Sequence, residues 1–310
     1  MRVFVAGATG AVGRHLVPQL VEAGHQVIAT TRTQTKFDRL WNLGAQPVLV
    51  DGLDAAAIGE AVAHAEPDAI IHQMTSLAGR QDLRHFDRTF DTTNQLRTVG
   101  TDSLLAAARA AGVRRFVAQS FTGWPNERVG APVKTEADPL DPNPPKNQRA
   151  SLAAIRHVER AVTEAPLEGV VLRYGAFYGP GASDELIGML RKRQLPVIGD
   201  GAGIWSFIHI ADAAAAAVAA LEQGSGIYNI VDDDPAPTSV VLPALAEIVG
   251  AKPPMHVPVW LGRLAAGEVP VVWMTQMRGS SNAKAKRELG WAPKWSSWRD
   301  GFRHGLGREE

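Results

Sequence analysis

The sequence contains no cysteine, which excludes a disulfide framework and a thiolate metal site, and we expect no metal ion. Its 32 basic and 32 acidic residues cancel, and the basic ones are dispersed, so nucleic acid and anionic membranes are not expected as partners. No apolar run is long enough to cross a bilayer, and no charged-then-apolar leader precedes the first expected strand at residue 2. We therefore expect a soluble cytoplasmic protein.

Tyrosine is scarce, with only Tyr174, Tyr178 and Tyr228 in the chain. All three fall in or directly behind expected strands, and the expected helix over 148–163 contains none. Because tyrosine is a common proton donor in catalysis, this scarcity limits where such a donor can lie. The 310 residues, 45% of them apolar, suit one large α/β unit or two closely joined lobes.

The N-terminal 32 residues carry the clearest pattern in the chain. Residues 2–6 form a β-branched and aromatic run that predicts a buried strand. Residues 14–23 place apolar side chains at helical spacing, and Gly24 is typical of a helix end. A second strand is expected over 26–30. The pattern is strand, tight turn, helix and strand.

The tight turn is rich in glycine and reads Gly7-Ala8-Thr9-Gly10-Ala11-Val12-Gly13. A strand, such a turn and a helix gather unpaired backbone N–H groups and the positive end of the helix dipole at one point. Gly7 allows the turn, Gly10 lets phosphates approach the backbone, and Gly13 lets the helix pack closely on the sheet. The loop therefore predicts a dinucleotide diphosphate site, against the alternative of a purely structural turn.

The spacing G-x-x-G-x-x-G resembles the short-chain dehydrogenase/reductase superfamily. Later motifs resemble its extended branch, the NAD(P)-dependent epimerase/dehydratase family, over essentially the whole chain. The resemblance implies a Rossmann-type α/β fold with a doubly wound parallel sheet. It places residues 1–174 and 204–231 in a dinucleotide-binding domain. Residues 175–203 and 232–310 would form a smaller, discontinuous α/β substrate lobe.

The end of the second strand decides between the two nicotinamide cofactors. NAD sites of this kind usually carry Asp or Glu there, to bond the ribose hydroxyls. Here the strand runs into Thr31 and Arg32, and no carboxylate appears until Asp38. A guanidinium can bond a 2′-phosphate and stack on adenine. We therefore expect NADP(H) to be preferred over NAD(H), although Arg32 also reads as a solvated loop cation.

Further cofactor contacts are implied by the family resemblance at the ends of the next strands. Asp51 and Gly52 resemble the step that contacts the adenine amine, while a capping role explains Asp54 without a ligand. Gln73 and Met74 stand where small residues usually touch ribose and diphosphate, so their side-chain roles stay open. The segment containing Phe177 resembles the one that meets the nicotinamide face.

The catalytic motif of the family is where this sequence departs from the pattern. Ser120 ends the fifth strand and matches the Ser or Thr that bonds the substrate's reacting oxygen, although a serine there also caps turns. The family carries Y-x-x-x-K on the next helix, in which Lys lowers the pKa of the Tyr. Aligning Glu159 with the acid that follows the Lys puts Ser151 and Ile155 at the Tyr and Lys positions.

Other donors must then be weighed. Ser151 can donate a hydrogen bond but is a poor general acid at neutral pH. Tyr178 is the best-placed remaining phenol and a candidate for both chemistry and substrate contact, with ring packing as the alternative. Lys134 lies in the proline-rich loop 132–145, Lys146 directly follows it, and both are expected to be solvated.

Two further segments have structural interpretations. His209 and Asp212 look like a metal or acid–base pair in isolation, but the resemblance implies bonds to backbone at a lobe junction. In the helical segment 96–110, Val99 is expected to face inward, and Arg97 occupies the Asn position of the family's N-x-x-G-T signature.

The pocket is expected to be aromatic and largely apolar, with Trp124 and Trp205 among its residues, which disfavours a nucleotide sugar. One hypothesis is an NADP(H)-dependent enzyme that acts on a small apolar carbonyl or alcohol by oxidoreduction, epimerisation or elimination, with a non-standard proton donor. The other is a catalytically silent dinucleotide sensor, which needs only the glycine loop. The sequence leaves substrate, direction, stereochemistry and oligomeric state open, with a homodimer as one option.

Overall fold

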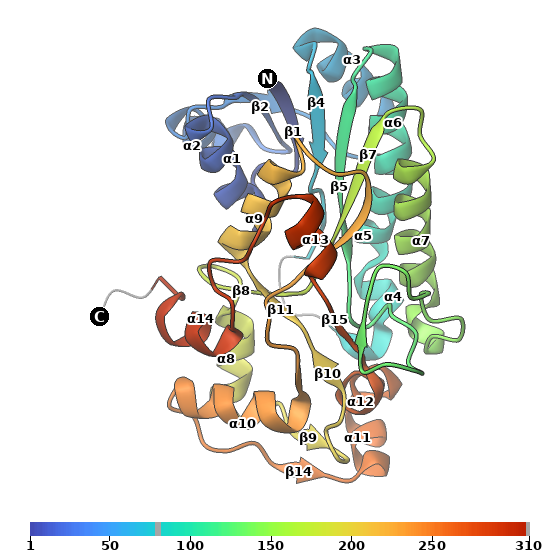
Figure 1. Ribbon diagram of the computed structural model, residues 1–310, viewed down its shortest axis with the longest axis vertical. Coiled ribbons are helices and arrows are strands. Elements are labelled where there is room, and N and C mark those ends of the chain that lie inside the picture. The colour runs from blue at the N-terminus through green and yellow to red at the C-terminus, as the bar shows by residue number, and fades with distance from the viewer. Residues whose placement is uncertain (78–81, 308–310) are drawn as a thin grey trace.

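The computed structural model describes residues 1–77 and 82–307 of the chain. Its centre is a seven-stranded parallel sheet with the order β12-β7-β5-β4-β1-β2-β3 (Figure 1). The strands are β1 (Arg2–Ala6), β2 (Gln26–Thr31), β3 (Gln46–Leu49), β4 (Ala69–His72), β5 (Arg115–Phe121), β7 (Glu168–Tyr174) and β12 (Gly226–Ile230). The strand order reverses between β1 and β4, and the crevice at such a reversal is where doubly wound folds bind ligands.

Helices cover both faces of the sheet, which explains the continuous apolar runs of its strands. Val3 and Val5 point into the core beneath α1 (Gly13–Glu22) and α9 (Ile210–Ala219). Phe4 and Ala6 alternate to the opposite core. That second core lies beneath α3 (Ala55–Ala65), α6 (Thr101–Ala110) and α7 (Arg149–Thr163), on the right of Figure 1. The doubly wound α/β fold predicted from the sequence is confirmed.

The helix that precedes β5 is not regular. It begins as α5 (Asp91–Gln95), passes through a π-helical turn, η3 (Leu96–Gly100), and continues as α6. The expectation that Val99 faces inward is wrong, since its side chain is 49% exposed. A π turn adds a residue to the helical cycle and shifts the side chains around the axis. The turn leaves Leu96 and Arg97 buried instead.

A third apolar cluster lies below the sheet in Figure 1 and includes Phe207, Trp298 and Phe302. Short strand pairs run through this region: β8 (Ala176–Tyr178) with β11 (Phe207–His209), β9 (Val197–Ile198) with β14 (His256–Val257), β10 (Ile204–Trp205) with β13 (Ala236–Pro237), and β6 (Val133–Lys134) with β15 (Gly279–Ser280). Its helices are α8 (Asp184–Arg191), α10 (Thr238–Ile248), α11 (Val259–Ala266), α12 (Glu268–Gln276) and α14 (Trp298–His304).

The remaining elements connect these parts. They are α2 (Phe37–Asn42), α4 (Phe86–Thr89), α13 (Ala283–Glu288) and the single turns η1 (Gln34–Lys36), η2 (Leu83–His85) and η4 (Lys146–Gln148). Beyond α12 the chain returns to the main sheet, where Ala285, Leu289 and Trp291 join the core beneath α1 and α9. Part of the segment 232–310 therefore packs on the dinucleotide side of the molecule.

Candidate active site

The glycine loop after β1 has a backbone that only glycine can form at two of its positions. Gly7 has a φ of +93°, and a Cβ there would lie 2.7 Å from the carbonyl carbon of Gln73. A Cβ on Gly13 would lie 2.4 Å from the carbonyl oxygen of Ala8. Gly10 is less confined, because its Cβ would meet only the Gly7 oxygen, at 3.3 Å. Protein atoms therefore do not fill the space beside Gly10, and a ligand could occupy it.

The first turn of α1 supplies donors for an anion beside this loop. The opening N–H groups of a helix have no intrahelical acceptor, and the helix dipole is positive at this end. Ala8 and Val12 are buried beneath the loop, Thr9 is half-buried, and Ala11 lies at the surface. Donors, space and surface access coincide here, so the residues present could hold a dinucleotide diphosphate.

The end of β2 lies next to the glycine loop, because Thr30 Oγ1 accepts a 3.1 Å hydrogen bond from the Gly7 N–H. Arg32 follows this strand and is exposed, as is Lys36. Among the described residues, no carboxylate forms an ion pair with Arg32. Its guanidinium could therefore receive a phosphate or a ribose.

Two further predicted cofactor residues, Asp51 and Gly52, follow β3. Asp51 is exposed, and its Oδ1 accepts a 3.1 Å bond from the N–H of Leu53. Gly52 is packed closely, since a Cβ there would lie 2.4 Å from the sulfur of Met74. Asp54 caps α3 by accepting a bond from the Ala57 N–H, as the sequence predicted.

Gln73 and Met74 lie where β4 ends, on opposite sides of the sheet. Gln73 Nε2 donates to the hydroxyl of Tyr174 at 3.0 Å, and its buried Oε1 has no partner among the described residues. Met74 fills the space between Gly52 and Gly100. The bulk of Met74 is therefore accommodated by glycines, and Gln73 keeps one acceptor free.

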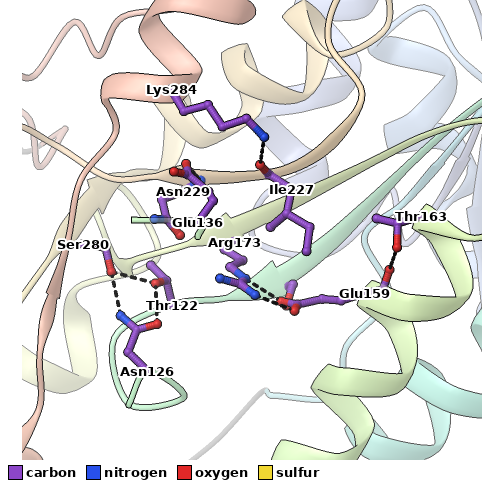
Figure 2. Close-up of polar contacts among 11 residues, drawn as sticks. Thr122, Asn126, Glu136, Glu159, Thr163, Arg173, Ile227, Asn229, Ser280 and Lys284 are labelled. Atoms are coloured by element: carbon purple, nitrogen blue, oxygen red, sulfur yellow. Dashed lines mark hydrogen bonds and ion pairs between the residues drawn. The ribbon is translucent and has the colours of Figure 1, made fainter. Parts of the chain in front are cut away.

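Ser120 belongs to a buried polar network between the sheet and α7. Its hydroxyl donates to Glu159 Oε1 at 2.8 Å. Arg173, paired with Ser120 in the register of β5 and β7, donates from Nε and Nη2 to the two oxygens of the same carboxylate, each at 2.7 Å. Figure 2 shows this ion pair, beside the hydrogen-bonded group of Thr122, Asn126 and Ser280. In this structure the Ser120 hydroxyl bonds the protein itself.

Ser151 lies in the first turn of α7, and two neighbouring segments hold its hydroxyl. It donates to Asp87 Oδ1 at 2.7 Å and accepts from Asn94 Nδ2 at 3.0 Å. Asp87 also accepts from the N–H groups of Ala150 and Ser151, so it caps α7 from α4. Sequence reasoning missed Asp87, because a cap supplied from 64 residues away has no local signature.

Arg97 is a buried cation with spare hydrogen-bonding capacity. It is 5% exposed, and its Nε and Nη1 have no partner among the described residues. Burial lowers the pKa of Arg97 to about 10, although the Glu159 charge opposes this shift. Near it, burial lowers the pKa of His72 to about 4, and His72 Nε2 lies 3.1 Å from Thr101 Oγ1. The interior beside α7 thus holds two arginines and one glutamate.

Tyr178 does not lie with these groups. Its side chain is fully buried, its ring stacks on Phe302 at 4.8 Å, and Phe207 and His209 meet it edge-on. Burial raises the pKa of its hydroxyl, and the charge of Asp232 adds to this effect. The phenol is enclosed in the third apolar cluster, so a role as proton donor to a substrate is corrected to ring packing.

The expected aromatic pocket is divided by the fold. Trp124 lies near the end of β5, where its ring is 6.3 Å from Phe121 and 6.4 Å from Trp273. Trp205 instead packs on Phe207, at 5.6 Å. Phe177 is half-buried, with its ring 5.4 Å from Tyr174. The structure thus places Trp124 at the carboxyl edge of the sheet and Trp205 against the third cluster.

The His209 and Asp212 pair is engaged by backbone groups. His209 Nε2 lies 2.9 Å from the carbonyl oxygen of Gly305, and its Nδ1 accepts from the Ala211 N–H. Asp212 accepts from the N–H of Trp295 at 2.9 Å. In the described part of the chain, no three His, Cys, Asp or Glu residues are grouped to hold a metal ion.

The two loop lysines do not behave alike. Lys146 is exposed, as expected, but Lys134 is 2% exposed, and its Nζ donates to Val129 O at 2.7 Å and Asp138 Oδ1 at 3.3 Å. The expectation of a solvated Lys134 is therefore wrong. Its strand, β6, pairs with β15, which draws the loop inward.

The parallel sheet, the glycine loop and the helix that follows it define a Rossmann-like α/β fold. The chain belongs to the NAD dependent epimerase/dehydratase family, whose model matches residues 3–231. Among the described residues, no helix is long and apolar enough to span a membrane.

Curated relatives of the chain include several reductases. It is 41% identical over 317 residues to a 3-diazoavenalumate denitrifying reductase of a Streptomyces species, with all of both chains covered. It is 30% identical to a 2-alkyl-3-oxoalkanoate reductase of Stenotrophomonas maltophilia, covering 81% of this chain and 76% of the relative. A dihydroquinoline-oxide ketoreductase of Stigmatella aurantiaca is 28% identical, covering 94% and 92%.

Solved structures share the whole architecture. A UDP-glucose 4-epimerase of Thermus thermophilus, solved with NAD, has a TM-score of 0.75 and 24% identity, covering 99% of this chain and 98% of that one. The enzyme of the same name from Thermotoga maritima, solved with UDP-glucose, has a TM-score of 0.76 and 22% identity, covering 99% and 97%. At these identities the likeness shows the fold.

Proposed function

We propose that this protein is an NADPH-dependent reductase that removes a diazo group from its substrate with release of dinitrogen. The family membership supports an oxidoreductase, and the Streptomyces relative supports this reaction by its name and its 41% identity. When bound, NADPH would supply a hydride. The reacting carbon of a protonated diazo or diazonium group would gain that hydride while the C–N bond breaks and dinitrogen leaves with the bonding electrons.

The observation that carries this proposal is the composition of α7, which contains no tyrosine and no lysine. Ser151 and Ile155 occupy the positions that the family resemblance assigns to Tyr and Lys. Carbonyl reduction leaves an alkoxide that must be protonated, and a serine is a weak acid for this task. Hydride transfer with loss of dinitrogen leaves no alkoxide, so this chemistry does not need the missing pair.

The chain's own residues would act by binding and orienting. We propose that the loop 7–13 binds the diphosphate, with the cofactor running past Asp51, Gly52, Gln73 and Met74 toward Phe177. Ser120 and Ser151, which are 3% and 0% exposed, would lie beneath the reacting end. Asp87 and Asn94 fix the orientation of the Ser151 hydroxyl, and its proton is already donated in the hydrogen bond to Asp87.

NADPH rather than NADH is supported by Arg32, which is exposed directly after β2 and free of acidic partners in the described chain. A 2′-phosphate would give this guanidinium a charge-assisted partner. We propose in addition that residues 175–203 and 232–310 provide the substrate side of the cleft, except for the stretch around Leu289 that packs on the main sheet.

The test is to mix the protein with carboxybenzenediazonium and NADPH deuterated at its reactive ring carbon. We expect NADPH oxidation, release of dinitrogen, and benzoate carrying deuterium at the former diazo carbon. A control without protein measures spontaneous decay of the diazonium. Benzoate or hydroxybenzoate without deuterium would show that the protein does not transfer the hydride, and would reject the proposal.

A second candidate is the reduction of a ketone, which the oxoalkanoate reductase and ketoreductase relatives favour. Screening the same assay with ketones and enones separates the two reactions. A silent dinucleotide sensor would instead bind NADPH in a titration, and NADPH would not be oxidised whichever class of substrate is added.

A further inference from the structure

Five aromatic rings meet at the carboxyl edge of the sheet and form what we call the aromatic cluster: Phe86, Phe90, Phe121, Trp124 and Trp273. The rings of Phe86 and Phe90 stack at 4.1 Å, and Phe86 meets the two indoles edge-on at 5.3 and 5.6 Å. The indoles lie nearly parallel, at 18°. Only Phe86 is fully buried; the other four rings are half-buried. The cluster therefore keeps aromatic surface accessible.

The aromatic cluster lies beside the reacting end of the proposed site. Asp87, which lies next to Phe86 in α4, bonds the hydroxyl and N–H of Ser151. Phe121 directly follows Ser120 at the end of β5. The cluster thus adjoins the Asp87 carboxylate that bonds Ser151, whereas Phe121 and Ser120, as successive residues of β5, point to opposite faces of the strand.

One polar atom of the cluster lacks a partner. The indole Nε1 of Trp273 is buried, and no acceptor for it exists among the described residues. A buried donor without an acceptor costs free energy, and a bound acceptor removes that cost. A carboxylate or carbonyl on a ligand seated against these rings would provide one.

The thiols and phenols that attack diazonium groups are absent or enclosed in the part of the chain that the structure describes, whereas His85 and Lys146, on the two turns beside α4, are exposed. The chain has no cysteine, and all three tyrosines are buried, with at most 1% of any side chain exposed. Lys134 is buried and bonded to Asp138. A diazonium ion couples readily to phenolate, thiolate and free amine, whereas an indole substituted at C3 reacts slowly. Indole faces also attract a cation.

We propose that the aromatic cluster seats the aryl ring of an arenediazonium substrate, with its diazonium nitrogen directed toward the start of α7, where the Ser151 hydroxyl is buried against Asp87 and Asn94. This inference rests on the proposed function and narrows its substrate class to planar aromatic compounds. In this arrangement the Tyr-to-Ser and Lys-to-Ile exchanges protect the enzyme, because a phenol or amine at these positions would be modified by the substrate.

The test restores a phenol and uses it as a trap, without NADPH, so that it does not depend on turnover. Two traps are made: Ser151→Tyr, and Phe90→Tyr, which adds one oxygen to a half-buried ring. In the trapping step the terminal diazonium nitrogen forms an N–C bond to the phenol ring and the ring carbon loses a proton. The product is a coloured azo compound of defined added mass.

Ala153→Tyr is the matched control, because residue 153 lies on the exposed side of the same helix. With carboxybenzenediazonium, we expect the traps to be modified at least about ten-fold faster than the control, because binding at the aromatic cluster raises the local concentration of the diazonium beside the new phenol. Adding Trp124→Ala to either trap, or excess benzoate, should return the rate to that of the control. Peptide mass spectrometry locates the azo group, and melting temperatures establish that each variant is folded.

If neither folded trap is modified faster than the control, the aryl ring does not bind at the aromatic cluster, even if the wild-type protein reduces the diazonium. Fast trapping without reduction by the wild type would instead retain the seat and reject the proposed reaction. Trapping that is unaffected by both Trp124→Ala and benzoate would also overturn the inference.

Discussion

Arg173 donates two hydrogen bonds of 2.7 Å to Glu159 in the interior of the protein, where both side chains are about 5% exposed. Ser120 donates a third bond to the same carboxylate, and the charge of Arg97 lies within electrostatic range. One carboxylate thus compensates two buried guanidinium groups. This relationship fixes α7 against the sheet strands that deliver Ser120.

Replacing Glu159 with Gln should therefore destabilise the protein by about 3–5 kcal/mol, because it leaves buried charge uncompensated. Urea unfolding measures this loss. The matched control is Glu168→Gln. The Glu168 side chain, which pairs with Arg115, is 69% exposed, so this change should cost less than about 1 kcal/mol. Equal effects of the two changes would contradict the assigned importance of the buried pair.

Gly10→Ala should weaken NADPH binding while leaving the fold intact. The new Cβ meets only the Gly7 oxygen, at 3.3 Å, but it would lie where phosphate approaches the loop. We expect a rise in Kd of at least about ten-fold, or roughly 1.4 kcal/mol, in a fluorescence titration. Gly59→Ala in α3 is the control, since nothing lies within 4 Å of its Cβ, and it should not alter Kd.

Arg32→Glu should reverse the cofactor preference. A carboxylate after β2 would repel a 2′-phosphate and accept hydrogen bonds from ribose hydroxyls. We expect the ratio of Kd for NADH to Kd for NADPH to fall by about ten-fold or more. Lys36 is also exposed but lies farther along the loop, so Lys36→Glu tests whether a general loss of positive charge is enough to change the ratio. A ratio unchanged by Arg32→Glu would remove the basis for the NADPH preference.

Asp232 should make stability fall as pH rises toward 8. Burial, as the main cause, raises the pKa of Asp232 to about 8, and its Oδ2 has no partner among the described residues. Between about pH 4 and pH 8 the folded state holds a proton that the unfolded chain releases, so unfolding becomes easier with rising pH.

Asp232→Asn should remove this slope and raise the free energy of unfolding at pH 8 by up to about 5 kcal/mol, since each unit of pKa shift is worth about 1.4 kcal/mol. Urea unfolding at several pH values between 5 and 8 measures the effect. Asp38→Asn, at an exposed position, serves as control and should keep the wild-type slope. A parallel pH dependence in wild type and Asp232→Asn would show that Asp232 titrates normally.

Tyr178→Phe should leave turnover unchanged and stability unchanged or raised by up to about 1 kcal/mol. The hydroxyl is buried in an apolar cluster without a partner among the described residues, so its removal relieves an unpaired polar group. Steady-state kinetics and thermal unfolding test both parts. A large fall in kcat with unchanged stability would restore the phenol as a catalytic candidate.

The sequence by itself was sufficient for the features encoded by near neighbours in the chain. The strand, glycine turn and helix at the N-terminus, and the Asp54 cap, depend on residues a few positions apart. The doubly wound sheet was implied by the family resemblance that the glycine spacing and the later motifs carry. Gly13 is readable because its constraint is steric and local: a Cβ there would meet the carbonyl oxygen of Ala8.

Only the tertiary structure decided which side chains meet across long separations. Asp87 reaches Ser151 from 64 residues away, and Trp273 joins Trp124 only after the chain has crossed most of the fold. Tyr178 looked available in a loop, yet α14 encloses it. Burial and pairing are set by packing between distant segments, and that information is absent from any local pattern of residues.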